Sequence, residues 1–222
     1  MKLEISKNDL AKMIIKQLDH FFNIDKEKYE HCFIRWSDKA LQRCEKNFSN
    51  NCNKYYNIGE EAIFSPFHSG QYTLFLYYLS NTIYQKTNNI EIPTKIYYLN
   101  KIMNSVDWYF ELALPDIFGV EHPLGSVMGR ANYSDYFFFY QGCTIGGNKG
   151  HYPTIGKNVT MYANSSIIGK SIVGDYVTLS IGTIIKDEDI PSCSLVFGQS
   201  PNLTIKKKSK AYMEELGTQF WK

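Results

Sequence analysis

Two histidines in the second half of the chain are the side chains whose type best suits proton transfer near neutral pH. An imidazole has a pKa close to the working pH of most enzymes, so it can serve as a general base. His122 directly follows Glu121 and comes fifteen residues after Asp107, so two carboxylates lie near it along the chain. The alternative interpretation is structural: His122 is then a surface histidine, and Asp107 caps a boundary between two kinds of structure.

His151 is the second candidate, because it lies in a segment that interrupts a regular pattern. This segment covers residues 146–154 and reads Gly-Gly-Asn-Lys-Gly-His-Tyr-Pro-Thr. Insertions of this kind carry functional residues more often than the regular elements do. Assignment of the base to His151 therefore stays open as the alternative to His122.

The interrupted pattern is a six-residue repeat of apolar side chains. It runs without a slip from Ile155 to Ile185, and it continues backwards from Ile145 to Trp108 with one additional residue on the way. A period of six indicates short parallel strands that each turn a corner, with one side chain per strand inside a narrow triangular prism. A β-sandwich would alternate with a period of two instead. About thirteen hexads predict a left-handed parallel β-helix of about four coils, with the interior positions Trp108, Leu114, Val120, Val127, Tyr133, Phe139, Ile145, Ile155, Met161, Ile167, Val173, Leu179 and Ile185.

The first half of the chain has a helical period. Leu10, Ile14 and Leu18 fall four residues apart, as one buried helix face requires. We expect a helical hairpin at the start, helices over about residues 25–47 and 71–85, and a polar connecting loop over residues 86–93. The predicted organisation is a helical N-terminal domain over residues 1–104, a β-helix domain over 105–204 and a C-terminal tail over 205–222.

Charge and cysteine content argue against several classes of partner. The 222 residues carry a formal net charge of +2, and no basic stripe alternates with aromatic residues as nucleic-acid binding would require. The five cysteines are odd in number and lack C-x-x-C spacing, which argues against a disulfide framework and a metal site. No segment has the apolar run of a signal peptide or a membrane span, so we expect a cytoplasmic protein without membrane insertion.

Residues 106–208 resemble the serine acetyltransferase family of hexapeptide-repeat acyltransferases. The family has a V-D pair followed fifteen residues later by an acidic residue and His, then Q-G-V-T-L-G-G, a loop that ends in H-P, and a closing G-x-P turn. The similar residues here are Val106-Asp107, Glu121-His122, Gln141-Gly142-Cys143-Thr144-Ile145-Gly146-Gly147, Gly150-His151-Tyr152-Pro153 and Gly198-Gln199-Ser200-Pro201.

The resemblance implies an acetyl-CoA-dependent O-acetyltransferase. His122 would take the proton from an acceptor hydroxyl while that oxygen attacks the thioester carbonyl. Asp107 would hold the other ring nitrogen, and Glu121 and His151 would contact the acceptor. Because a filled β-helix has no internal cleft, the sites are expected between the subunits of a homotrimer, with a dimer of trimers as the alternative.

For acetyl-CoA, the resemblance implies a groove along one edge of the coils, with no metal. Backbone amides at Ala163 and Ile181 would line it, next to the turn from Gly198 to Pro201. The pair Gly146-Gly147 would let the backbone approach the thioester. Lys206, together with Lys207 and Lys208, would lie near the phosphates, unless these lysines form a solvated basic tail.

The acceptor is the part of the resemblance with the clearest departure. The family places Arg before the loop histidine, where it grips the carboxylate of serine, and this chain has Gly150 there. Serine or a similar small acceptor stays the implied substrate, with Lys149 as the neighbouring cation. The alternative acceptor is a sugar of a surface polysaccharide or its precursor, and the alternative of another class is a non-catalytic β-helix scaffold.

Overall fold

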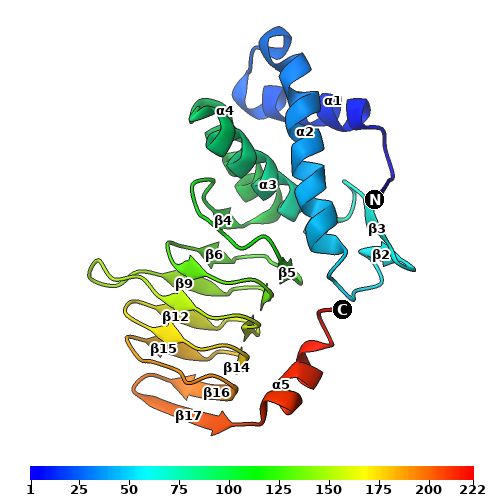
Figure 1. Cartoon of the computed structure of the whole chain (residues 1–222). Helices are drawn as coiled ribbons and strands as arrows, with labels where there is room; N and C mark the ends of the chain where they lie inside the picture. Colours follow the sequence, from blue (N-terminus) through cyan, green and yellow to red (C-terminus); the bar gives the residue numbers. More distant parts are fainter. The chain divides into compact units, whose positions relative to one another are not determined.

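The computed structural model describes residues 1–222, whose contacts separate into two units (Figure 1). The helical unit consists of Met1–Ser49, Lys54–Ser105 and Tyr109–Glu111. The β-helix unit consists of Asn50–Asn53, Val106–Trp108 and Leu112–Lys222. Each unit is therefore described by itself. None of the five helices combines the length and the hydrophobicity that a membrane span needs.

The helical unit begins with the predicted helical hairpin. Helix α1 (Lys7–Phe22) packs against α2 (Lys26–Phe48), and Leu10, Ile14 and Leu18 are all buried on one face of α1. Side chains cap both helices, because the Ser6 hydroxyl accepts from the Asp9 N–H and the Asp25 carboxylate from the Lys28 N–H. Strands β1 (Lys2–Leu3), β2 (Asn57–Ile58) and β3 (Glu61–Phe64) form a small sheet in the order β1-β3-β2.

Helix α3 (Ser69–Thr87) is buried all round rather than on one face. Every residue from Gly70 to Ile83 is buried, which is why its apolar residues show little helical period. Its polar side chains are satisfied inside the unit; the Asn81 amide, for example, donates to the Phe110 carbonyl at 2.8 Å. The helices predicted over residues 25–47 and 71–85 are confirmed.

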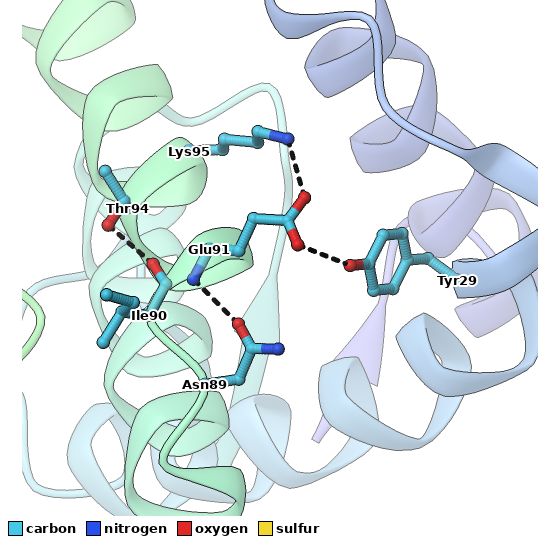
Figure 2. A network of polar contacts seen from close by, with 6 residues as sticks. All are labelled: Tyr29, Asn89, Ile90, Glu91, Thr94 and Lys95. Carbon is cyan, nitrogen blue, oxygen red and sulfur yellow. Dashed lines mark hydrogen bonds and ion pairs between the residues drawn. The ribbon is translucent and has the colours of Figure 1, made fainter.

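The predicted loop over residues 86–93 is wrong, because two helices occupy most of it. Helix α3 continues to Thr87, and α4 (Glu91–Asn104) begins at Glu91. Pro93 is tolerated in the first turn of α4, since the N–H groups there need no partner within the helix. Figure 2 shows how this turn is anchored: Asn89 accepts from the Glu91 N–H at 2.7 Å, and the Glu91 carboxylate accepts from Lys95 at 3.0 Å and from Tyr29 at 3.3 Å.

The β-helix unit is a parallel solenoid with three faces (Figure 1). Face one consists of β4 (Asp107–Trp108), β6 (Val127–Met128), β9 (Thr144–Gly146), β12 (Ser166–Ile168) and β15 (Ile184–Lys186). Face two consists of β7 (Asn132–Tyr133), β10 (Thr154–Ile155) and β13 (Ile172–Val173). Face three consists of β5 (Phe118–Val120), β8 (Phe137–Phe139), β11 (Thr160–Met161), β14 (Val177–Leu179) and β16 (Ser194–Gln199).

The six-residue repeat is confirmed in its regular part. Each residue from Ile155 to Ile185 at this spacing is at most 1% exposed, because one side chain per strand fills the prism. Five strands stack on face one, so the solenoid has five turns rather than the predicted four. The fifth turn was missed because its interior residues, Ile190 and Val196, follow Ile185 at spacings of five and six.

One predicted interior residue is wrong. Val127 is 40% exposed, and Met128, at 2%, fills the prism instead. The backbone register agrees, since Met128 lies opposite Ile145. Val120 and Met128 are eight residues apart, so the corner between them is two residues longer than a regular hexad allows, and the next spacing is one residue short.

The last residues of the chain pack on the outside of face three. Residues 205–222 contain the end of β17 (Asn202–Lys207), which pairs antiparallel with β16, and helix α5 (Lys210–Gly217). Beyond α5, Phe220 and Trp221 are buried against Ile117 and Phe138. The Lys222 N–H donates to the Asn50 carbonyl at 2.9 Å, so the C-terminal segment is tied to the β-helix unit at both of its ends.

Candidate active site

His122 lies on the edge of the prism where face three turns into face one, here named corner A. Corner A consists of residues 121–126, 140–143, 162–165 and 180–183, one segment per coil. Because Phe139, Met161 and Leu179 are in register, counting two residues onward from each aligns Gln141, Ala163 and Ile181. In the first coil Leu124 continues this column, since the Gly142 N–H donates to the Leu124 carbonyl, and His122 lies two residues before it in the same corner. The predicted base and both predicted amide positions thus share one edge of the solenoid.

The segment that carries His122 is longer than the others in corner A. Five positions separate His122 from Val127, whereas three separate Gln141 from Thr144. His122 has a φ of 49° in the left-handed region, which is uncommon for a residue other than glycine. The segment is nonetheless anchored, since the Ser126 hydroxyl donates to the Pro123 carbonyl at 2.6 Å and accepts from the Trp108 indole at 3.0 Å.

The His122 imidazole projects into solvent without a hydrogen-bond partner in the chain. Asp107 is half-buried on β4, and its backbone N–H donates to the Ser126 carbonyl at 2.9 Å. The structure therefore brings Asp107 to the His122 segment but forms no hydrogen bond between the two side chains. Catalytic hydrogen bonds are often absent or long before substrate binds.

Two backbone N–H groups of corner A are available to a ligand. The N–H groups of Ala163 and Ile181 donate to no acceptor within the chain. Ile181 is 71% exposed, so nothing of this chain covers its part of the corner. Strand β16 crosses the same corner at Gly198, whose φ of 86° requires glycine, and Gly198 continues the column because Val196 is in register with Leu179. Pro201 follows in the turn between β16 and β17.

Glu121 precedes His122 and lies at the outer end of face three. Tyr140 follows it on the next coil, since the N–H groups of Glu121 and Tyr140 donate to the carbonyls of Phe139 and Met161 at 3.2 and 3.1 Å. Burial raises the pKa of Tyr140 well above its usual range, and the negative charge of the neighbouring Glu121 raises this pKa further. The Tyr140 ring stacks on Tyr162, with centroids 5.1 Å apart and an interplanar angle of 15°.

His151 lies on another edge, corner B, where face one turns into face two. Corner B consists of residues 147–153, 169–171 and 187–189. Asn148 and His151 exchange two backbone hydrogen bonds of 2.9 Å, and Lys149 and Gly150 between them have φ values of 48° and 78°. These values define a two-residue hairpin turn of type I′. The His151 side chain is exposed at the end of this turn.

The glycines predicted for acetyl-CoA binding also lie at corner B. Gly146 ends β9, and its carbonyl accepts from the Gly169 N–H at 2.9 Å. Gly147 allows the Tyr152 ring to approach the backbone, since a Cβ there would lie 2.7 Å from a ring carbon. The structure therefore separates Gly146 and Gly147 from Ala163 and Ile181, which lie at corner A.

Lys206 lies on β17, opposite Leu195 of β16. Its ammonium group is 5.3 Å from the centre of the Phe197 ring, which is itself 36% exposed. Lys206 thus stands next to the end of corner A that is farthest from His122. No group of three or more His, Cys, Asp or Glu side chains comes together as a metal site would require.

The two candidate histidines are therefore on different edges of one prism. His122 follows a strand of face three, whereas His151 follows a strand of face one. Two features that were not predicted do have signals in the sequence. The interior spacing of eight residues after Val120 indicates the longer His122 segment, and the pair Lys149-Gly150 is typical of a two-residue hairpin turn.

The sequence matches no protein-family model and no curated protein sequence. Among solved structures, the serine acetyltransferase of Neisseria gonorrhoeae superposes with a TM-score of 0.73 at 16% identity, over 96% of this chain and 84% of that one. The fold is that of the serine acetyltransferases. The enzyme of Vibrio cholerae gives a TM-score of 0.71 at 16% identity, over 92% of this chain and 81% of that one. A serine acetyltransferase in complex with CoA gives 0.57 at 16% identity, over 82% and 73%.

Proposed function

We propose that this chain is an acetyl-CoA-dependent O-acetyltransferase that transfers the acetyl group to the hydroxyl of serine or a similar small acceptor. The observation that carries the proposal is the column along corner A. It begins with the segment that carries His122, a histidine without an intramolecular partner, and continues through the unpaired N–H groups of Ala163 and Ile181. The shared fold with a serine acetyltransferase that binds CoA supports it.

The geometry of the column suits an extended ligand. Successive coils are about 4.8 Å apart, so His122 and Ile181 are separated by three steps, or about 14 Å. A pantetheine arm that lies along the corner can accept hydrogen bonds from the two free N–H groups, with its thioester near His122. The nucleotide end then lies toward β17, where the ammonium group of Lys206 suits a phosphate.

In the proposed reaction, His122 acts as the general base. The acceptor oxygen forms a bond to the acetyl carbonyl carbon while its proton moves to the imidazole. The carbon–sulfur bond then breaks, and the coenzyme A thiolate leaves and receives that proton. Asp107 would hold the other ring nitrogen after a small adjustment of the longer corner segment, and so stabilise the imidazolium.

The proposed site is completed by a second subunit, because His122 and His151 lie on different edges of one chain. In a homotrimer, corner A of one subunit and corner B of its neighbour would enclose the acceptor. Glu121 and His151 would then contact it from the two sides. A dimer of trimers is compatible with the same site.

The direct test is release of coenzyme A thiol from acetyl-CoA in the presence of L-serine. O-Methyl-L-serine, which lacks the hydroxyl, is the matched control and should give no release above background. Thiol release that does not depend on an acceptor hydroxyl, or no release with any acceptor, contradicts the proposal.

The loop at corner B also favours a second class of acceptor, a sugar. Gly150 has a φ of 78°, and the family's carboxylate-gripping Arg is absent there, so a carboxylate on the acceptor has only Lys149 nearby in this loop. The exposed Tyr152 ring could instead pack on the apolar face of a sugar. Glucosamine and nucleotide sugars therefore belong in the same assay, and transfer to one of them without transfer to serine would select the sugar alternative.

The shared site has its own test. Purified His122→Ala and His151→Ala proteins are unfolded together, refolded as a mixture and assayed. If each site takes His122 from one subunit and His151 from another, random mixing restores about a quarter of the natural sites. Activity that equals the mean of the two separate variants would contradict a site between subunits.

A further inference from the structure

A pocket of about 330 Å³ lies between the outer surface of face three and helix α5, within the β-helix unit (Figure 1). Its floor is formed by Thr160 of β11 and Thr178 of β14, which are in register on neighbouring strands. Met213 and Leu216 of α5, with Trp221 beyond it, form the opposite wall. The volume is at the lower end of the range for small-molecule sites, so the pocket suits a ligand of about one ring.

The floor of this pocket carries hydrogen-bonding side chains that the protein itself does not use. Thr160 is only 6% exposed, yet its hydroxyl makes no hydrogen bond within the chain. The Thr178 hydroxyl and the Asn158 side-chain amide also line the pocket without a partner. The backbone beneath them is fixed, since the Asn158 N–H donates to the Asp135 carbonyl at 3.2 Å. Buried polar groups are rarely left unpaired in a folded protein, so these three groups are available to a ligand.

The walls of the pocket are aromatic and apolar. Tyr136 and Tyr176 are half-buried, and they occupy equivalent positions on the coils before and after that of Asn158. Met213 is 4% exposed and Leu216 is half-buried on the facing side of α5. The pocket thus combines polar groups on its floor with apolar surface on its sides. A pyranose ring has the matching chemistry, because hydroxyls surround it while its C–H groups form an apolar face.

The charges around the pocket favour a neutral ligand. Lys157 and Lys222 line it together with Glu214, so the two signs are mixed and no cluster of cations is present to bind a phosphate. The ammonium group of Lys157 is 5.3 Å from the centre of the Tyr136 ring, and Glu214 is paired with Lys210 at 3.3 Å. The C-terminal end of α5 also borders the pocket, and its partial negative charge disfavours an anion further.

We propose that this pocket binds a neutral sugar ring, a pyranose unit of a saccharide, at a site separate from the acetyl-transfer site. The hydroxyls of Thr160 and Thr178 and the amide of Asn158 bind the hydroxyls of the ring. Met213 and Leu216 pack on its apolar face. The proposal does not rest on acetyl transfer, since none of these residues belongs to corner A or corner B.

The test is saturation-transfer NMR on the full chain, with D-glucose, D-galactose and N-acetyl-D-glucosamine as probes. At least one of them should bind, and a titration gives its Kd. Thr160→Val and Thr178→Val should each raise this Kd about fivefold, the usual effect of one lost neutral hydrogen bond. Thr154→Val is the matched control on face two, where the hydroxyl only accepts a long hydrogen bond of 3.3 Å from Asn132, and it should leave the Kd unchanged.

Two further measurements keep the result unambiguous. The Thr160 hydroxyl has no partner to lose, so Thr160→Val should leave the thermal unfolding midpoint unchanged, and weaker binding then reflects the site and not the fold. D-Glucuronate and D-glucosamine add a charge to the glucose ring and should bind more weakly than D-glucose.

No saturation transfer to any of the three sugars overturns the proposal, and so does tighter binding of D-glucuronate than of D-glucose. A sugar that binds Thr160→Val and Thr178→Val as well as the natural protein is bound elsewhere, for example as an acceptor, and also overturns this site. Thiol release from acetyl-CoA should be the same in these two variants as in the natural protein. Its absence in the natural protein would contradict the proposed function and leave the sugar site standing.

Discussion

Corner A and corner B are two edges of one prism, but different hydrogen bonds hold their backbones in place. The His122 segment of corner A is tied to the neighbouring coils, because the Ser126 hydroxyl accepts from the Trp108 indole at 3.0 Å and the Gly142 N–H donates to the Leu124 carbonyl at 2.9 Å. The His151 loop of corner B is held mainly by its own hairpin bonds and by the Asn148 amide, which donates to Asp187 at 2.6 Å.

This difference suggests a different role in catalysis for each corner. A general base must keep its place to within a fraction of an ångström, so it belongs on the corner that is anchored on both sides. A contact to the acceptor tolerates more movement and can lie on a hairpin. Changes at corner A should therefore affect kcat, and changes at corner B should affect the acceptor KM.

The largest expected effect is on the stability of the prism, on which both corners depend. Ile167 is fully buried in the prism and stacks between Ile145 and Ile185. Ile167→Asp places an unpaired carboxylate where no water reaches it and should lower the free energy of unfolding by at least about 4 kcal/mol. Circular dichroism during thermal unfolding measures this. An unchanged midpoint would mean that the interior of the prism does not hold the fold together.

The next prediction distinguishes the two corners by their effects on kcat and on the acceptor KM. His122→Ala should lower kcat by about 10²–10⁴ with little change in the KM for acetyl-CoA, as expected for a lost general base. His151→Ala should mainly raise the acceptor KM. Steady-state kinetics with both substrates varied decides between them, and the reverse pattern would move the base to His151.

Glycine replacements test how firmly each corner is anchored. A Cβ on Gly142, at corner A, would lie 2.1 Å from the Asn164 side-chain oxygen, and its φ of 65° is strained for alanine. Gly142→Ala should therefore cost about 2–3 kcal/mol of stability. Gly150, at corner B, has a φ of 78° but open space around it. Gly150→Ala should therefore lower the free energy of unfolding only through backbone strain, by about 1–2 kcal/mol. Urea unfolding of both variants gives the comparison, and equal losses would contradict it.

The smallest effect concerns the cation of corner B. Lys149→Ala removes the charge at the tip of the hairpin and should raise the KM for L-serine about tenfold, if the ammonium group binds the acceptor carboxylate. Lys170→Ala, an exposed lysine on the next coil of the same corner, is the control. A sugar acceptor should be insensitive to both changes, so this pair also distinguishes the two acceptor classes.

The β-helix could be predicted from the sequence because each coil repeats the same environment. An interior residue such as Ile167 meets an equivalent residue above and below it, so its spacing alone defines its position. The same reasoning works for α1, where one face is buried. It also located α3, although this helix is buried all round, but it failed over residues 86–93, where polar, Asn-rich residues indicated a loop and α4 begins at Glu91.

The sequence by itself determined the two kinds of structure, the regular interior positions and the candidate residues His122, Glu121 and His151. Only the tertiary structure decided which of these residues share an edge, because corner lengths shift the register: Met128, not Val127, fills the prism. It also decided that His122 and His151 lie on different edges of the prism. Such contacts join residues of different coils, and a local pattern carries no information about which side chains the coils bring together.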